Sequence, residues 1–234
     1  MAIDSLHFVR RPQLLAGAKH LFGTFKAPGL FIVLLACGVG VISGALVAAM
    51  GWIVQQMHWY LFGLPKGARL SSMFALFEPS HALVPLAGGV VMGASIAWLR
   101  YRKYRTPIDP IEANALHGGR MSLTDTFIIV FQTIISSGFG ASVGLEAGYT
   151  QIGSGVASRI GRSFGLRRND VRMLVGCGAA AAISAAFDAP LTGAFYGFEL
   201  IIGVYTIVNV APVLAAALMG SVTADLLNVR RQHQ

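Results

Sequence analysis

Glu146 is the residue whose type and surroundings point most directly to a chemical task. No charged residue occurs from Phe127 to Leu145, and Glu146 follows directly. A carboxylate at the end of such a run is costly in a membrane unless it has a partner, water or a task. The residues after it, through Gly153, are rich in glycine and polar side chains. This pattern predicts a broken membrane helix, with a carboxylate placed where backbone amides open toward a cavity.

Ser142 offers a second kind of chemistry, because residues 140–144 match the G-x-S-x-G pattern of serine hydrolases. A nucleophilic serine needs a histidine base within hydrogen-bond reach. The pattern also belongs after a strand, and no strand is predicted here. Small-residue packing beside a helix break is therefore the favoured interpretation. The candidate bases are His58, His81 and His117.

Other chemistry is not indicated. The histidines lack metal-ligand spacing, and the chain has neither a Walker A motif nor a dinucleotide fingerprint. Cys37 and Cys177 lie inside apolar runs, as small buried residues do. We expect no cofactor and no metal, and a protein that is not an enzyme.

The composition predicts a membrane protein. Hydrophobic residues make up 55% of the chain and charged residues 12%, about half the share of a soluble domain. The net charge of +8 comes from Lys and Arg outside the apolar runs, as in the cytoplasmic segments of an inner-membrane protein. Nucleic-acid binding is the alternative for such a basic chain, but no aromatic-interleaved basic patch supports it. We expect a lipid bilayer as partner and no nucleic acid.

The first part of the chain predicts two spans. Residues 1–29 are amphipathic and basic, which predicts a helix on the cytoplasmic membrane face. Apolar runs follow at Leu30–Val54 and Ala82–Leu99, each long enough to span. A basic cluster, Arg100–Arg105, comes next. By the positive-inside rule, the N-terminus and this cluster are both cytoplasmic, in the bacterial inner membrane.

The middle of the chain predicts interrupted helices. A short polar helix is expected over Ile111–Leu116, with Asp109 as its N-cap. Thr124 or Asp125 should cap the apolar run Phe127–Leu145, and a Gly/Ser-rich helix should run from Glu146 to about Ser163. The arginines of residues 159–172 are interpreted as a solvated loop in contact with lipid headgroups.

The last part of the chain predicts a second break. An Ala/Gly helix over Met173–Phe187 should end at Asp188-Ala189-Pro190, and a half-length piece, Leu191–Phe198, should end at Glu199. The final span is Leu200–Ala224, kinked at Pro212, before a polar tail over 228–234. Broken segments among long spans are typical of a transport site. Glycine pairs at spacing four predict close helix packing: Gly40 and Gly44, Gly89 and Gly93, Gly140 and Gly144.

Two stretches resemble signatures of the CLC chloride channels and transporters. Residues 144–153 read G-L-E-A-G-Y-T-Q-I-G, where that family has G-K/R-E-G-P-x-x-Q-I-G. Residues 178–193 read G-A-A-A-A-I-S-A-A-F-D-A-P-L-T-G, followed by Glu199, and resemble the family's G-A-A-A-x-x-A-A-x-F-N-A-P-x-x-G and later E. Upstream, Ile111-Glu112 and Ala115-Leu116 stand where the family has I-E-G-A-L.

The resemblance implies an anion pathway. Family members are two-fold dimers in which each subunit builds a pore from two inverted halves, with anions held by amides at broken-helix N-termini. By this resemblance Glu146 is the gate. The amides of Ala147, Gly148 and Tyr149 line the anion site. The family's other anion motif, G-S-G-I-P, is replaced by Thr106-Pro107-Ile108-Asp109-Pro110, so Thr106, Pro107 and Ile108 are the remaining anion-binding candidates.

Departures from the family pattern matter for coupling and for assembly. Leu145 replaces a basic residue, and Glu199-Leu200 replaces the E-E pair whose second glutamate serves the proton path in family transporters. Glu199 is therefore the only proton-path candidate of that pair. The family's membrane domain is also nearly twice as long as this chain, so residues 30–227 resemble one half-domain that needs a second.

These observations predict an all-α polytopic membrane protein with broken, tilted helices, one half of a CLC-type inverted repeat. The function expected is passage of chloride or a similar anion, as a channel or a transporter, in a homodimer. Two alternatives remain at this point. One is an intramembrane serine hydrolase that uses Ser142, and the other is a non-conducting membrane fragment.

Overall fold

The computed structural model describes residues 28–63, 83–204 and 206–232, and within those ranges the chain consists of helices and their connections. No strand occurs in the described ranges, and four of the helices there are long and apolar enough to cross a membrane. The predicted all-α polytopic class is confirmed. The amphipathic segment predicted over residues 1–29 lies almost wholly outside the described residues.

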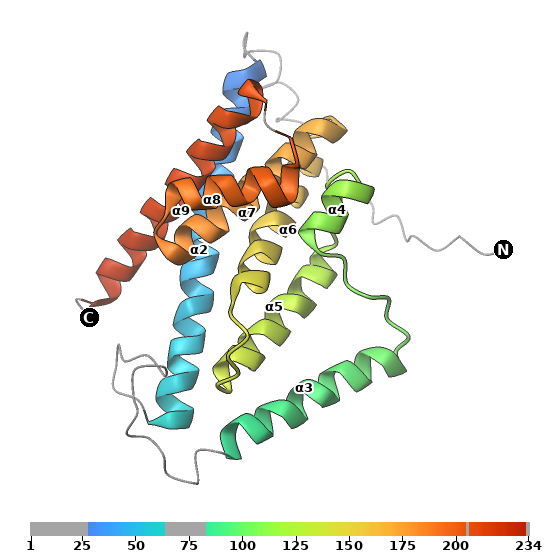
Figure 1. The fold of residues 1–234 in the computed structure, drawn as a ribbon, viewed down its shortest axis with the longest axis vertical. Helices are drawn as coiled ribbons and strands as arrows, with labels where there is room; N and C mark the ends of the chain where they lie inside the picture. Colours follow the sequence, from blue (N-terminus) through green and yellow to red (C-terminus); the bar gives the residue numbers. More distant parts are fainter. Residues whose placement is uncertain (1–27, 64–82, 205, 233–234) are drawn as a thin grey trace, which may run out of the picture.

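Helix α2 (Pro28–Phe62) runs through the bundle, and helix α3 (Leu83–Tyr101) lies apart from it (Figure 1). Helix α2 continues beyond the predicted end at Val54, and its 35 residues measure about 52 Å at 1.5 Å per residue. That exceeds a hydrocarbon core of about 30 Å, so α2 must tilt or protrude. Helix α3 matches the predicted second span and contacts α5.

Helices α4 and α5 test the predicted caps. Helix α4 (Pro110–Leu116) begins as predicted, and the Asp109 carboxylate accepts a hydrogen bond from the Glu112 amide at 2.7 Å. Helix α5 runs over Leu123–Gly138. The prediction that Thr124 or Asp125 caps it is wrong, because the N-cap is Ser122 and the Asp125 side chain is engaged elsewhere. The helix also ends at Gly138 and not at Leu145, since residues 139–145 form a loop.

Helices α6 (Glu146–Ser163) and α7 (Arg168–Phe187) form the centre of the fold. Helix α6 has its predicted bounds, and α7 begins five residues before the predicted Met173. The two backbones meet where Gly153 and Gly178 face each other, and a Cβ at either position would collide with the other helix's carbonyl. Most of α7 is buried, so this apolar helix forms the core of the described fold.

The predicted second break is present between α7 and α8 (Pro190–Tyr196). A π-helical turn, η4 (Gly197–Ile202), continues the piece beyond Glu199, where the sequence predicted its end. Helix α9 (Ile207–Gln232) contains Pro212 and begins later than the predicted Leu200. It extends through Gln232, into the region predicted as a polar tail.

The glycine pairs differ in role. Gly40 and Gly44 of α2 pack against the backbone of α9 at Ala216 and Gly220, as close helix packing requires. Gly89 and Gly93 meet nothing within 4 Å. The third pair, residues 140 and 144, is not in a helix: both have positive φ, in the loop before α6.

Candidate functional site

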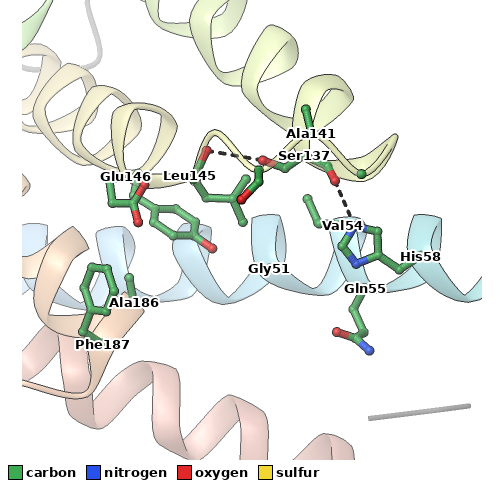
Figure 2. A pocket seen from close by; sticks show the side chains of 14 residues that line it. Gly51, Val54, Gln55, His58, Ser137, Ala141, Leu145, Glu146, Ala186 and Phe187 are labelled. Carbon is green, nitrogen blue, oxygen red and sulfur yellow. Dashed lines mark hydrogen bonds between the residues drawn. The ribbon is translucent and has the colours of Figure 1, made fainter. Parts of the chain in front are cut away.

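Glu146 lies at the edge of a cavity of about 690 Å³ between α2, the α5–α6 loop and the end of α7 (Figure 2). The cavity combines an apolar wall with polar groups from α2 and the loop. No described residue forms a hydrogen bond or an ion pair with the Glu146 carboxylate. The lining residues that the argument uses are Gly51, His58, Ser142, Gly144, Glu146 and Tyr149.

The first turn of α6 leaves backbone amides without partners. Leu145 is the N-cap and provides no side-chain hydrogen bond. The Tyr149 amide donates to the Leu145 carbonyl at 2.9 Å, which is the first bond of the helix. The amides of Glu146, Ala147 and Gly148 therefore have no acceptor within the helix, and the positive end of the helix dipole coincides with them.

The Glu146 carboxylate folds back over the loop that precedes it. A Cβ built on Gly144 would collide with Oε2 of Glu146, and Gly144 has φ +71°. Glycine is thus required at position 144 both for its backbone conformation and for the room that the carboxylate occupies. The arrangement places the carboxylate over the loop at the N-terminal end of its own helix.

Two hydrogen bonds hold the loop in place (Figure 2). The Ser137 hydroxyl donates to the Gly144 carbonyl at 3.3 Å, and Nε2 of His58 lies 2.8 Å from the Ser137 carbonyl oxygen, which it can reach only as a donor. The Tyr149 side chain reaches α2, where its hydroxyl would lie 3.7 Å from a Cβ on Gly51. Helix α2 therefore supports the cavity from the opposite side.

Residues 106–108, the other predicted anion ligands, reach α6 further along the helix than Glu146. Nε2 of the buried Gln151 donates to the Ile108 carbonyl at 3.1 Å. Gln151 is five residues after Glu146, or about 7.5 Å along the helix. Thr106 is exposed, Pro107 and Ile108 are half-buried, and none of the three lines the cavity at Glu146. The fold thus brings Ile108 beside α6 but not to the carboxylate.

Asp125 is a residue whose role the sequence did not reveal. It is 1% exposed, and its two oxygens are engaged by the Tyr104 hydroxyl and an Arg105 guanidinium nitrogen, each at 2.7 Å. Burial and the carboxylate raise the pKa of the Tyr104 phenol. The clamp fixes the start of the 102–109 segment to the first turn of α5. A lone acidic residue at the start of an apolar run was its only signal.

Tyr196 lies at the end of α8 and Glu199 on η4, and neither lines the cavity at Glu146. Tyr196 is half-buried, hydrogen-bonds with Thr150, and lies within electrostatic range of both Asp109 and Glu146. It therefore stands between the two groups of predicted site residues. Glu199 is exposed on η4.

The geometry does not support the hydrolase alternative. Ser142 lies in a loop between two helices, without the strand that precedes a nucleophile elbow. Nε2 of His58 is directed to the Ser137 carbonyl, and His117 ends α4. His81 lies outside the described residues. Within the described ranges, no three His, Cys, Asp or Glu side chains are grouped to hold a metal ion.

Proteins similar to this chain are described as chloride channel proteins. A ClcB-like protein of Ralstonia nicotianae is 31% identical over 191 residues, which cover 79% of this chain and 43% of that protein. The voltage-gated ClC-type chloride channel ClcB of Yersinia pseudotuberculosis is 26% identical over 81% of this chain and 47% of its own length. The chain spans about half the length of the curated relatives it matches.

A solved structure gives the same result for the fold. The crystal structure of a slow cyanobacterial Cl⁻/H⁺ antiporter superposes with a TM-score of 0.62 at 22% identity, over 87% of this chain and 48% of that one. Residues 88–233 match the family described as voltage gated chloride channel, and they include both stretches that carry the CLC resemblance. The chain belongs to the voltage gated chloride channel family.

Proposed function

We propose that this chain forms one half of a pathway that moves chloride or a similar anion across a bilayer, as a channel or a transporter. The observation that carries the proposal is the position of Glu146. Its carboxylate has no described partner, borders a cavity, and lies at the N-terminal end of α6, where the helix leaves amides free. A helix N-terminus of this kind binds anions.

In the proposed mechanism Glu146 is the gate. The ionised carboxylate competes with an incoming anion for the free amides of the first turn of α6. Protonation or displacement of the carboxylate releases them. The amides of Ala147 and Gly148 are the anion donors. Tyr149 acts through its side chain, because its amide already donates to Leu145. Thr106, Pro107 and Ile108 form a second contact along α6, next to Gln151.

Proton coupling is proposed to be weak or absent. Glu199 is the candidate for a proton path, and the following residue, Leu200, has an apolar side chain that cannot relay a proton. A chloride gradient that drives uphill proton movement in stoichiometric amounts would contradict this part of the proposal.

The proposed assembly is larger than the chain. Transport sites of inverted-repeat proteins lie between the two halves, so a second half-domain is required. The working protein is a homodimer of such complete units in the bacterial inner membrane, with a cytoplasmic N-terminus. Residues 30–227 are assigned to the half-domain in this proposal, residues 1–29 are assigned to the cytoplasmic side, and α9 continues from the half-domain through Gln232.

Chloride efflux from vesicles tests the proposal. The chain is reconstituted alone and together with the C-terminal half of the Yersinia ClcB relative. We expect no selective efflux from the chain alone, because unsatisfied backbone groups in lipid cost several kcal/mol each and disfavour a half-site. Efflux is expected from the pair, with loss of its pH dependence in Glu146→Gln. The control is Glu112→Gln, which removes an exposed carboxylate on α4. Selective efflux from the chain alone would overturn the need for a second half, and an unaltered pH profile in Glu146→Gln would overturn the gate.

A further inference from the structure

Arginines from three elements converge where α4, α6 and α7 meet. The centre is the turn between α4 and α5, which contacts both α6 and α7 (Figure 1). We call these residues the arginine cluster. Its members are Arg120 on the turn, Arg159 and Arg162 on the last turns of α6, and Arg168 and Arg172 on the first turns of α7.

Several contacts bring the five arginines near the turn between α4 and α5. A Cβ on Gly118 would collide with the Arg168 side chain, and one on Gly119 would lie 3.0 Å from the Arg172 Cα. Arg162 lies within electrostatic range of Arg159 and Arg120. The spacings 159/162 and 168/172 each place two guanidinium groups on one helix face. The cluster is therefore a property of the fold and not of one basic stretch.

Hydrogen bonds tie the turn beneath the cluster to α6. The buried Ser158 hydroxyl donates to the Gly119 carbonyl at 2.7 Å and accepts from the Met121 amide at 2.9 Å. Arg162 donates through NH2 to the Met121 carbonyl at 2.8 Å and through Nε to the Ser158 carbonyl at 3.3 Å. Arg162 thus helps to build the platform, while Arg120, Arg159 and Arg168 are exposed.

The cluster has no acidic partner in the described part of the chain. Its five cations form no ion pair there, and the ion pair that is present joins Arg105 to Asp125. Asp170, one turn into α7, is the nearest carboxylate in sequence and forms no described ion pair with them. Nε of Arg172 is buried without a hydrogen-bond acceptor. The N-cap of α7, Arg167, also provides no side-chain bond to the helix amides. Donors and positive charge are in excess, and acceptors are missing.

The other basic cluster shows the contrast. There Arg105 pairs with Asp125, and the Arg102 guanidinium lies 5.4 Å from the Trp98 ring centre, within cation–π range. Those side chains have partners from the protein itself. The arginine cluster has no such partner in the described part of the chain, so an external anion is the missing component.

The geometry points to a phosphate oxyanion as the ligand of the arginine cluster, bound between Arg120, Arg159 and Arg168. A guanidinium fork donates two parallel hydrogen bonds to two oxygens of one phosphate, which a spherical chloride ion cannot accept. Arg168 is the first residue of a helix of membrane-spanning length, so the cluster lies at the level of lipid headgroups. Basic pockets between membrane helices bind anionic headgroups in this way. The same phosphate chemistry is offered by a lipid headgroup and by free phosphate.

Titration of the purified full chain in neutral detergent tests the site and distinguishes the two sources. The probes are short-chain phosphatidylglycerol, phosphatidylcholine of equal chain length, and inorganic phosphate, each followed by calorimetry. The site variant is Arg120→Gln with Arg159→Gln. The control is Arg100→Gln with Lys103→Gln, which removes the same charge from the other basic cluster. We expect phosphatidylglycerol binding about 20- to 30-fold weaker in the site variant and changed less than about twofold in the control.

Each outcome decides the proposal. Binding of phosphatidylglycerol that inorganic phosphate does not displace supports the site with a headgroup as ligand. Displacement by inorganic phosphate supports the site with free phosphate as ligand. Equal loss in the two variants would show that net charge alone matters, and would overturn it, as would absence of binding by the unmodified chain. If the double variant is unfolded in a melting control, Arg168→Gln alone replaces it, with an expected loss of about fivefold.

Discussion

The two helix breaks of this chain contain similar residues but differ in how their polar groups are hydrogen-bonded. Both place a carboxylate beside the start of a helix: Glu146 after the 139–145 loop, and Asp188 before α8. At the second break the Asp188 carboxylate accepts a hydrogen bond from the Ser221 hydroxyl at 2.6 Å, and Pro190 removes one of the amides that would need an acceptor. At the first break the carboxylate has no described partner and borders a cavity.

Only the first break has the features of a candidate site, and the second serves as a structural connection between α7 and α8. The second break is closed by the protein itself, since the Asp188 and Ala189 amides both donate to the Ser184 carbonyl. The first leaves free amides, a free carboxylate and space in one place. A carboxylate at a helix break is therefore not enough to identify a candidate gate. The carboxylate and the nearby amides must also lack hydrogen-bond partners within the protein.

The largest expected effect is on stability at the second break. A Cβ on Gly193 would collide with the Ala180 carbonyl and lie 2.7 Å from the Ser184 amide nitrogen, so Gly193→Val must push α8 away from α7. We expect a loss of about 3 kcal/mol, the upper part of the range for overpacking. Gly89→Val on α3 meets nothing within 4 Å and serves as control. The melting temperatures of the two variants are measured by thermal unfolding in detergent. Equal values would show that α7 and α8 are not tightly packed at Gly193.

A smaller loss of stability is expected when a serine near each break is replaced by alanine. Ser221→Ala removes the hydrogen bond to Asp188 and should cost about 1 kcal/mol, because Asp188 is exposed and water replaces part of the bond. Ser142→Ala removes a loop hydroxyl with no described hydrogen bond and should change the free energy of unfolding by less than about 0.5 kcal/mol. A larger loss for Ser142→Ala would contradict the distinction between the closed and open breaks.

The smallest effect on the free energy of unfolding is expected from a substitution of His58, whose hydrogen bond supports the loop at residues 139–145. His58→Gln replaces the donor to the Ser137 carbonyl with a longer, more mobile one, and should cost about 0.5 kcal/mol. Its clearer readout is hydrogen exchange, which should become faster in residues 139–145. His117→Gln, at the end of α4, is the control. Unchanged exchange in His58→Gln would mean that α2 does not support the loop.

Sequence patterns predicted the parts of the fold that depend on local chemistry. The apolar length of α3, the Asp109 cap, the start of α6 at Glu146 and the break at Pro190 are confirmed. The extension of α2 to Phe62 was missed, because residues 55–62 contain polar side chains and lack the apolar signal of a span. Gly140 and Gly144 looked like a packing pair because spacing cannot distinguish a helix from a loop.

The candidate site was predicted less completely than the fold. The position of Glu146 at a helix break could be predicted from one carboxylate after an uncharged run, whereas its proposed role as a gate came from the family resemblance. The Asp125 clamp, the Gln151 bond to Ile108 and the position of Tyr196 join residues distant in sequence, and no local pattern reports such contacts. The Tyr149 amide was taken as an anion donor, and only the backbone geometry assigns it to the first bond of α6.

The most direct test compares the two carboxylates in the assembly that conducts. Chloride efflux is measured over a range of pH for the unmodified protein, for Glu146→Gln and for Asp188→Asn. If the open break holds the gate, Glu146→Gln abolishes the pH dependence of efflux, because the side chain can no longer ionise, and Asp188→Asn retains it. A pH profile that survives in Glu146→Gln would contradict the account, and its loss in Asp188→Asn would place the titrating group at the second break.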